Sequence, residues 1–135
     1  MIVVDTSAIV AIALGEPERA AFVLAIQAAD RASISTVSML EARMVVHGRR
    51  GQRAVVLVDD LLRLPVFEPI APGLAQTDAA YAAFVAYGKG SGHPAQLNFG
   101  DVFSYTLAKL RGLPLLYKGD DFAQTDVVSA LANLR

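Results

Sequence analysis

The sequence contains no cysteine, and this single absence removes several classes of site. Without cysteine the chain forms no disulfide, no zinc site with thiolate ligands and no cysteine nucleophile. Long apolar runs are missing too, since no uninterrupted stretch approaches the roughly 20 residues that span a bilayer. Residues 1–5 lack the basic start of a signal peptide, so we expect mature sequence there. We therefore expect a soluble, cytoplasmic protein without a membrane partner.

An excess of positive charge is absent as well. The 135 residues include 12 Lys and Arg against 13 Asp and Glu, which gives a formal net charge of −1. No bulk positive field would draw such a protein onto nucleic acid, so any binding of that kind must be local. The candidate patches are Arg43, Arg49, Arg50 and Arg53 in one stretch, and Lys109, Arg111 and Lys118 in another. Solvated helix ends explain each patch equally well.

Composition and length favour one folded domain over residues 1–135. Apolar residues make up 54% of the chain and charged residues 19%, which excludes a disordered chain. The length suffices for a single core but not for two. Short apolar stretches typical of buried strands occur at residues 2–4, 32–35, 66–70 and 115–117. Pro69 makes the third of these a candidate edge strand.

Helices are predicted between the strands. Their expected ranges are residues 8–14, 17–29, 38–48, 53–64 and 73–87, followed by a helix that Asn98 caps and Gly112 stops. Strands that alternate with helices imply an α/β fold, a three-layer α/β/α sandwich with a mainly parallel sheet, because parallel strands need helical crossovers. The glycine-rich residues 88–94 are predicted to form a mobile loop.

Acidic residues occur where the predicted strands end or helices begin. They are Asp5 after the first strand, Glu41 in a Ser-x-x-Glu helix start, Asp101 three residues after the Asn98 cap, and Asp120 and Asp121 after the last strand. The pattern places Glu41 in a first helical turn. Because the carboxyl ends of parallel strands line one edge of a sheet, these acids can converge although they are distant in sequence.

Clustered carboxylates of this kind predict a metal site. Like charges raise one another's pKa unless a cation neutralises them, and oxygen ligands without His or Cys select Mg²⁺ or Mn²⁺ over zinc. Such a centre polarises a phosphoryl oxygen and lowers the pKa of a bound water, so the predicted reaction is metal-assisted hydrolysis of a nucleic-acid backbone. Thr6 and Ser7, beside Asp5, could orient a carboxylate, a bound water or a substrate phosphate, or could simply cap the helix.

Each acid also has an ordinary structural explanation. Glu41 and Asp101 could complement helix dipoles, a role worth roughly 0.3–1 kcal/mol each, and Asp120-Asp121 could form an ordinary turn. Asp5 is harder to explain in this way. A carboxylate directly after a buried strand is poorly solvated and needs a cation or several hydrogen-bond donors.

Two other protein classes place acids at strand ends. A phosphatase with an aspartyl nucleophile would need a second Asp two residues after Asp5, where Ser7 stands. A receiver domain would need its acid pair near the first strand and not at Asp120-Asp121. The order of the acids therefore argues against both classes.

The acidic motifs taken together resemble those of PIN-domain ribonucleases, above all the VapC toxins of bacterial toxin–antitoxin systems. The motifs are Asp5-Thr6-Ser7-Ala8, Glu41 in its Ser-x-x-Glu context, Asn98-Phe99-Gly100-Asp101 and Lys118-Gly119-Asp120-Asp121-Phe122, with Leu14-Gly15-Glu16-Pro17-Glu18 between the first two. The resemblance implies a PIN-like fold and a Mg²⁺- or Mn²⁺-dependent endoribonuclease that cuts tRNA or rRNA. It also implies a homodimer and a small cognate VapB-like antitoxin.

Carried over residue by residue, the resemblance makes Asp5 and Asp101 the principal metal ligands and Glu41 a third, direct or through water. Asp120 or Asp121 is the fourth acid. We prefer Asp120, because Asp121 beside Phe122 could cap the next turn. The basic residues proposed to contact RNA are Arg43, Lys89, Lys109 and Lys118, and the loop that contains Lys89 is expected to gate or contact the substrate.

A second hypothesis keeps the fold without the chemistry. In that hypothesis the chain is a catalytically silent PIN-like module that dimerises and pairs with an antitoxin-like protein. The sequence retains all four acidic positions, which favours the enzyme.

Overall fold

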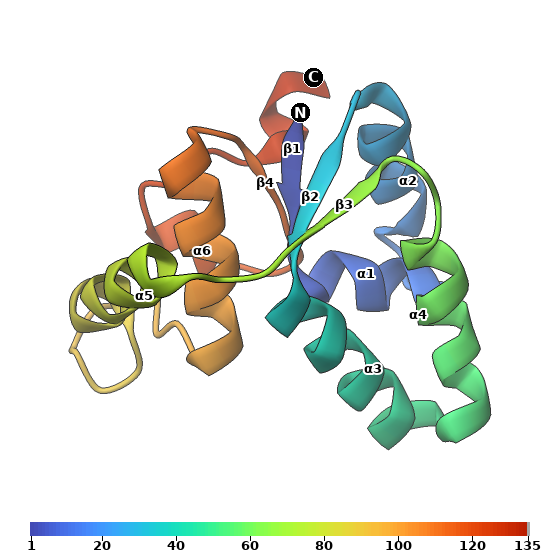
Figure 1. The fold of residues 1–135 in the computed structure, drawn as a ribbon, viewed down its shortest axis with the longest axis horizontal. Helices are drawn as coiled ribbons and strands as arrows, with labels where there is room; N and C mark the ends of the chain where they lie inside the picture. The colour runs from blue at the N-terminus through green and yellow to red at the C-terminus, as the bar shows by residue number, and fades with distance from the viewer. Residues whose placement is uncertain (135) are drawn as a thin grey trace.

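The fold is built on a short parallel sheet. In the computed structural model, which describes residues 1–134, the strands follow the order β3-β2-β1-β4 (Figure 1). Their bounds are Ile2–Val4 for β1, Ala32–Ser35 for β2, Phe67–Ile70 for β3 and Leu115–Leu116 for β4. All three neighbouring pairs are parallel. The mainly parallel sheet is therefore confirmed, and β3 is an edge strand as its proline indicated.

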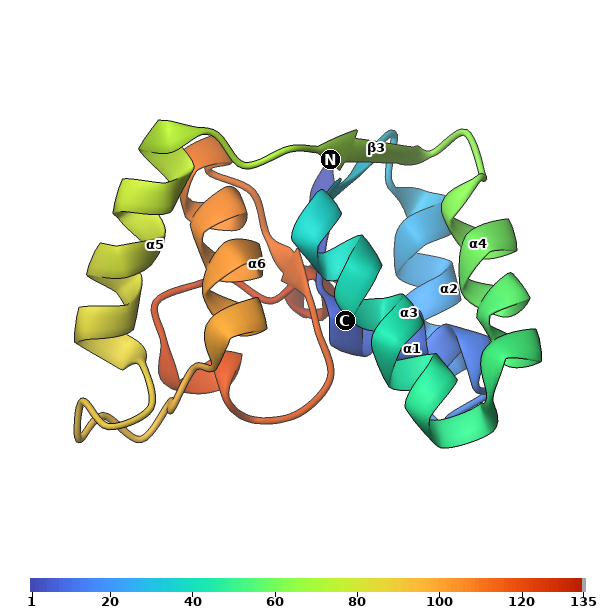
Figure 2. The same cartoon turned by 60° about the horizontal axis from the view of Figure 1, so that its bottom comes forward.

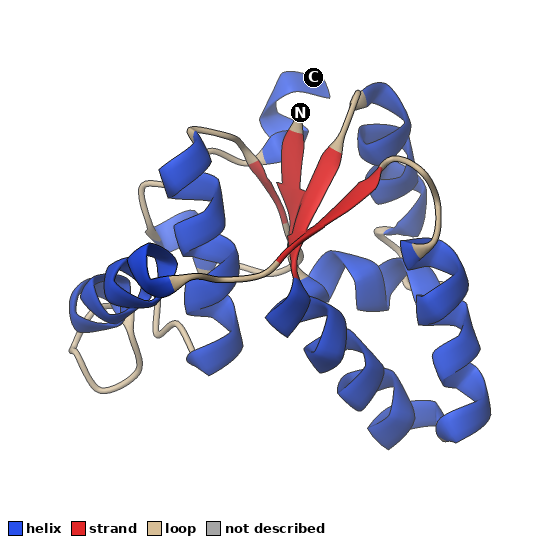
Figure 3. Cartoon of the chain, viewed as in Figure 1, coloured by secondary structure: helices blue, strands red, loops and turns tan. Residues whose placement is uncertain are grey.

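Helices cover both faces of this sheet. They are α1 (Thr6–Ala13), α2 (Arg19–Ala28), α3 (Thr36–Arg50), α4 (Val55–Leu62), α5 (Leu74–Tyr87) and α6 (Phe99–Arg111), with short 3-10 helices η1 (Gln52–Ala54), η2 (Phe122–Gln124) and η3 (Ala130–Leu134). Figure 2 shows α5 and α6 on one side of the sheet and α1 to α4 on the other. Figure 3 shows the strands fanning out between these two groups. No helix within residues 1–134 is both long and apolar enough to cross a membrane.

The two faces of the sheet have separate cores. Ile2 and Val4 of β1 pack among the side chains of α1 to α4, whereas Val3 packs against α5 and α6. The split follows from strand geometry, because successive side chains point to opposite faces. Both cores meet at β1, the strand that Asp5 directly follows. The three-layer α/β/α sandwich expected from the sequence is confirmed.

Helix α3 begins earlier than its Ser-x-x-Glu pattern predicted. Its N-cap is Ser35, the last residue of β2, whose hydroxyl accepts a hydrogen bond from the N–H of Val37 at 3.2 Å. Ser38 is buried inside the helix, where its hydroxyl bonds that of Ser104 in α6 at 3.1 Å. Glu41 therefore lies in the second turn, and its placement in a first turn was wrong because strand and helix join without a loop.

Other bounds differ by smaller amounts. Helix α2 begins at Arg19 and not at Pro17, and α4 begins only after η1. Helix α6 begins after its Asn98 cap and ends at Gly112, whose φ of +63° is left-handed, as predicted. Residues 88–94 are irregular, apart from the bridge between Gly88 and Leu97, and their mobility stays a prediction.

The two faces of α6 give a first test of this packing. Leu107 is completely buried, whereas Leu110 is 55% exposed. We expect Leu107→Ala to lower the free energy of unfolding by about 2–5 kcal/mol, because it leaves a cavity. Leu110→Ala should change it by less than about 0.5 kcal/mol. Urea denaturation measures both values, and equal losses would contradict the buried face assigned to α6.

Candidate metal centre

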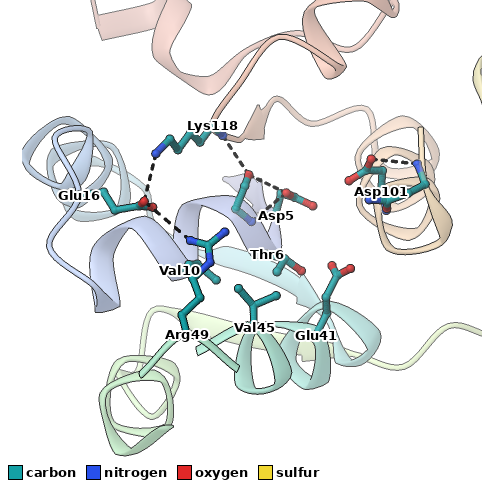
Figure 4. Close-up of a pocket in the computed structure, with 11 residues that line it drawn as sticks. Asp5, Thr6, Val10, Glu16, Glu41, Val45, Arg49, Asp101 and Lys118 are labelled. Carbon is teal, nitrogen blue, oxygen red and sulfur yellow. Dashed lines mark hydrogen bonds and ion pairs between the residues drawn. The ribbon is translucent and has the colours of Figure 1, made fainter. Parts of the chain in front are cut away.

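The carboxyl ends of the central strands open into a cavity of about 250 Å³ (Figure 4). Three of the predicted acids line it from three different elements: Asp5 between β1 and α1, Glu41 in α3 and Asp101 in the first turn of α6. The other lining residues are Thr6, Ser7, Val10, Glu16, Val45, Arg49, Asn98 and Lys118. The parallel topology thus brings these acids to one place, as the strand-end pattern indicated.

Only one of the two carboxylate oxygens of Asp5 has hydrogen-bond donors in the described part of the chain. Its Oδ2 accepts hydrogen bonds from the Ser7 N–H at 2.9 Å and the Ser7 hydroxyl at 2.7 Å. Its Oδ1 is buried and has no hydrogen-bond partner within residues 1–134, while the whole residue is 2% exposed. A buried carboxylate oxygen without a donor is costly unless a cation lies beside it. Asp5 therefore presents a ready ligand atom.

Asp5 itself caps helix α1, so the alternative that Thr6 or Ser7 is the N-cap is wrong. Ser7 instead bridges two strand ends. Its hydroxyl donates to Asp5 and accepts from the main-chain N–H of Lys118 at 2.9 Å. The Thr6 hydroxyl turns the other way and donates to the main-chain oxygen of Ser38 at 3.2 Å. Ser7 orients the Asp5 carboxylate, and Thr6 fastens α1 to α3.

Asp101 belongs to a capping box at the start of α6. Its main-chain N–H donates to Asn98 Oδ1 at 2.9 Å, and its Oδ2 accepts from the Asn98 N–H at 3.0 Å. The pKa of Asp101 is raised to about 7, chiefly by burial, with smaller contributions from the charges of Asp5, Glu41 and Asp121, while the hydrogen bond from Asn98 lowers it. Around neutral pH the cavity therefore holds its full negative charge poorly without a cation.

Glu41 reaches across from α3 to the backbone of α6. A β-carbon added at Gly100 would lie 2.5 Å from Cδ of Glu41, closer than real side-chain contacts allow. The carboxylate thus occupies the space that any other residue at position 100 would fill. It also lies beside a helix N-terminus, where negative charge is favoured. Glycine at position 100 therefore leaves the space that the Glu41 carboxylate occupies.

The donor set fits a hard divalent cation. The cavity offers carboxylate oxygens and no imidazole or thiolate, and one of those oxygens is buried without a partner. Within residues 1–134, no three acidic or histidine side chains lie close enough to bind one ion together. The acids therefore share a cavity without forming a closed cage.

Asp120 and Asp121 lie in the exposed turn after β4, and neither lines the cavity. Asp121, and not Asp120, is among the charges that raise the pKa of Asp101. Asp121 precedes η2, yet its side chain makes no capping hydrogen bond. The reason for preferring Asp120 is therefore wrong, and the assignment of the fourth acid stays a prediction.

The four basic residues predicted to contact RNA do not lie together. Lys118 lines the cavity. Arg43 pairs with Asp59 at 2.7 Å between α3 and α4, and Lys109 pairs with Asp126 at 3.1 Å in the last turn of α6, opposite the end that carries Asp101. Lys89 is exposed in the irregular segment after α5.

Glu16 and Arg49 line the cavity, although from the sequence Arg49 had only a place in a candidate basic patch and Glu16 had no predicted role in the site. Glu16 follows Gly15, whose φ of +66° turns the chain back so that the Glu16 N–H donates to the Ala11 oxygen at 2.9 Å. Arg49 follows Glu41 by eight residues, on the face of α3 that it shares with Val45. In the sequence, the eight-residue spacing from Glu41 could have pointed to Arg49, and the Gly15-Glu16-Pro17 turn could have pointed to Glu16.

Comparison with known proteins agrees with this fold. The PIN domain family model matches residues 2–128. VapC ribonuclease Mb0640 of Mycobacterium bovis is 43% identical over 127 residues, covering 94% of this chain and 96% of that protein. Ribonuclease VapC28 of Mycobacterium tuberculosis is 44% identical over 131 residues, with coverages of 96% and 97%.

Solved structures show the same architecture. The crystal structure of VapC20 from Mycobacterium tuberculosis, described as a sarcin–ricin loop cleaving toxin, has a TM-score of 0.79 at 18% identity and covers 95% of this chain and 97% of that one. A toxin–antitoxin complex from Klebsiella pneumoniae has a TM-score of 0.70 at 17% identity, with coverages of 96% and 98%. The fold is that of a PIN domain. The chain belongs to the PIN-domain family and, within it, to the VapC ribonucleases, as the sequence motifs indicated.

The contact between Glu41 and Gly100 predicts a specific defect. Gly100→Ala should displace the Glu41 carboxylate and weaken Mn²⁺ binding roughly tenfold, the range seen when support around a metal ligand is lost. Gly48→Ala in α3 is the control, because its β-carbon meets nothing within 4 Å. Calorimetric titration with Mn²⁺ measures both affinities. Equal affinities would contradict the steric role of Gly100.

The raised pKa of Asp101 predicts how stability depends on pH in the metal-free protein. Between its ordinary value of 3.8 and about 7, the folded state binds a proton that the unfolded state has lost. This contribution is present in full below about pH 4 and is lost as the pH rises through about 7. We expect the Tm in EDTA to fall over this range more steeply than that of Asp101→Asn. Parallel Tm profiles would contradict the shift.

Proposed function

We propose that this chain is a Mg²⁺-dependent endoribonuclease, with Mn²⁺ able to replace Mg²⁺, and that it is the toxin of a toxin–antitoxin pair. The observation that supports this best is the convergence of Asp5, Glu41 and Asp101 in one cavity, where Asp5 Oδ1 is buried without a donor. An all-oxygen site of this kind suits Mg²⁺ chemistry on phosphodiesters.

Asp5 and Asp101 would hold the ion, and Glu41 would contribute directly or through water. Mg²⁺ keeps several of its waters and uses one or two protein carboxylates, which suits acids that do not reach a common point. When bound, the ion supplies Lewis-acid polarisation of the phosphoryl oxygen and a more acidic water. Ser7 orients the Asp5 carboxylate with two hydrogen bonds, and the Asn98 main-chain N–H orients the Asp101 carboxylate with one.

The proposed substrate is RNA of the translation machinery, either tRNA or rRNA. The relatives at 43% and 44% identity are named ribonucleases, and VapC20 is described as cleaving the sarcin–ricin loop. The Arg49 side chain, which lines the cavity, is 57% exposed. The cavity is therefore open to solvent on that side, and a polymer can approach it.

A VapB-like antitoxin is the proposed regulatory partner. Solved structures with this fold include the toxin–antitoxin complex from Klebsiella pneumoniae and VapBC2 from Rickettsia felis bound to a DNA fragment from its promoter, with a TM-score of 0.71. A homodimer is also proposed. Its support is an apolar groove between α5 and α6, where Tyr81 and Phe99 are 71% and 75% exposed. No feature of the cavity favours the silent-module hypothesis.

The acids give the direct test of this function. We expect Asp5→Asn and Asp101→Asn to lower RNA cleavage at least about a hundredfold, since each removes a proposed ligand without changing side-chain size. Asp78→Asn on exposed α5 is the matched control and should cleave at the wild-type rate. Cleavage of total RNA with added Mg²⁺ or Mn²⁺ is followed on a gel.

Excess EDTA should stop cleavage by the wild type, and added Mg²⁺ should restore it. Cleavage that persists in EDTA, or in both carboxylate variants, would show that the acids do not act through a metal ion.

A further inference from the structure

The cavity has an acidic half and a half that carries two cations. The acids of the candidate metal centre lie to one side, whereas Arg49 and Lys118 lie to the other, around Glu16 (Figure 4). Glu16 Oε2 is 3.9 Å from Nη1 of Arg49 and 3.2 Å from Nζ of Lys118. One carboxylate oxygen therefore bridges two cations, which is an arrangement that a phosphate oxygen can also adopt.

Three remote segments supply this group. Glu16 comes from the turn after α1, Arg49 from the last turn of α3 and Lys118 from the end of β4. Lys118 is fixed further by Glu18, whose Oε2 lies 3.2 Å from its Nζ. Its main chain is tied to Asp5 through the Ser7 hydroxyl. The fold therefore sets the position of the cations relative to the acids.

Stability gives little reason for the cluster. The side chains of Arg49 and Lys118 are 57% and 37% exposed, and exposed ion pairs contribute about 0–1 kcal/mol. A guanidinium has five N–H donors. Within residues 1–134, the Arg49 side chain makes the loose contact to Glu16 but no hydrogen bond, so most of its donors are available to an incoming anion.

The position of Arg49 along α3 indicates which phosphate of an RNA strand it can contact. Glu41, Val45 and Arg49 recur every four residues on the cavity face of this helix. Eight residues advance an α-helix by about 12 Å, and the Arg49 guanidinium points toward Glu16 (Figure 4). This rise separates the backbone of Arg49 from that of Glu41 by more than one phosphate group spans. Arg49, with Lys118 beside the same Glu16 carboxylate, is therefore placed for a phosphate other than the one at the acids.

We propose that Arg49 and Lys118 form a subsite for a backbone phosphate of the RNA next to the phosphate that is cleaved. This inference rests on the proposed ribonuclease function and adds the path of the substrate to it. The strand crosses the cavity from the α6 side, where Asp101 lies, toward the ends of β4 and α3. Phosphate contacts of this type position a nucleic acid without reading its sequence.

The test neutralises one phosphate at a time. Once the cleavage site is mapped, each phosphate flanking the cleaved bond is replaced by an uncharged methylphosphonate. For the wild type, one of the two replacements should raise KM by roughly threefold to tenfold with little change in kcat. Arg49→Ala and Lys118→Ala should raise KM by a similar factor on unmodified RNA. In these variants the methylphosphonate should raise KM much less than it does in the wild type, because the contact is already lost.

Arg63→Ala is the matched control, because Arg63 at the end of α4 is also an exposed, ion-paired arginine but does not line the cavity. It should behave as the wild type on every RNA. The subsite would be overturned if the KM losses from Arg49→Ala and from the methylphosphonate were fully additive, or if Arg49→Ala behaved as Arg63→Ala does.

A binding measurement separates this inference from the proposed function. Fluorescence anisotropy with a labelled single-stranded RNA, in EDTA and at several salt concentrations, needs no cleavage. The slope of log K against log salt should shrink by about 0.7 for each of Arg49→Ala and Lys118→Ala, and should not change for Arg63→Ala. Unchanged slopes overturn the subsite even if cleavage occurs. Loss of cleavage by the wild type, with these slopes intact, overturns the nuclease function alone.

Discussion

The double role of Asp5 determines much of the rest of the structure. It ends the central strand and caps the next helix with one carboxylate oxygen, which leaves the other oxygen buried without a donor. The buried strand before Asp5 and the helix directly after it supply no further donor to this oxygen within residues 1–134. A cation or an ordered water in the cavity would satisfy it, and a cation would also offset its charge. The place for the proposed ion is therefore set by the first secondary-structure junction of the chain.

Asp101 and Glu41 are also incompletely stabilised by the protein, each to a different degree. Asp101 has hydrogen bonds from a capping box, yet burial still raises its pKa to about 7. Glu41 has packing against Gly100 in place of hydrogen bonds. The cavity is thus an unfavourable arrangement for the isolated protein, and its residues are placed for a ligand. Such local conflicts with stability are expected where a protein performs chemistry. The nearby cations compensate for only part of this charge, because Glu16 and Glu18 already engage Lys118.

Much of this arrangement was predictable from sequence, because it follows from local rules. A β-branched run ending in Asp5 and an Asn98 cap three residues before Asp101 fix two acids at element ends. The start of α3 was mispredicted, since Ser35 and Ser38 are both good caps and only tertiary contact with Ser104 decides between them. Glu16 reaches the cavity through a turn, and Arg49 reaches it through its position around α3. The sequence indicates placements of this kind less clearly. Their role depends on packing between segments that local patterns do not specify.

The buried bond between the hydroxyls of Ser38 and Ser104 has a consequence for ion choice. These small side chains set how closely α3 approaches α6, and each helix carries one acid of the cavity. A bulkier pair at this crossing would move α3 away from α6, and with it Glu41 away from Asp101. Since Mg²⁺ and Ca²⁺ differ in radius and in the rigidity of their coordination, such a change in the proposed metal centre would favour the larger ion. In the proposed enzyme, the choice between divalent ions would therefore depend on a helix–helix contact.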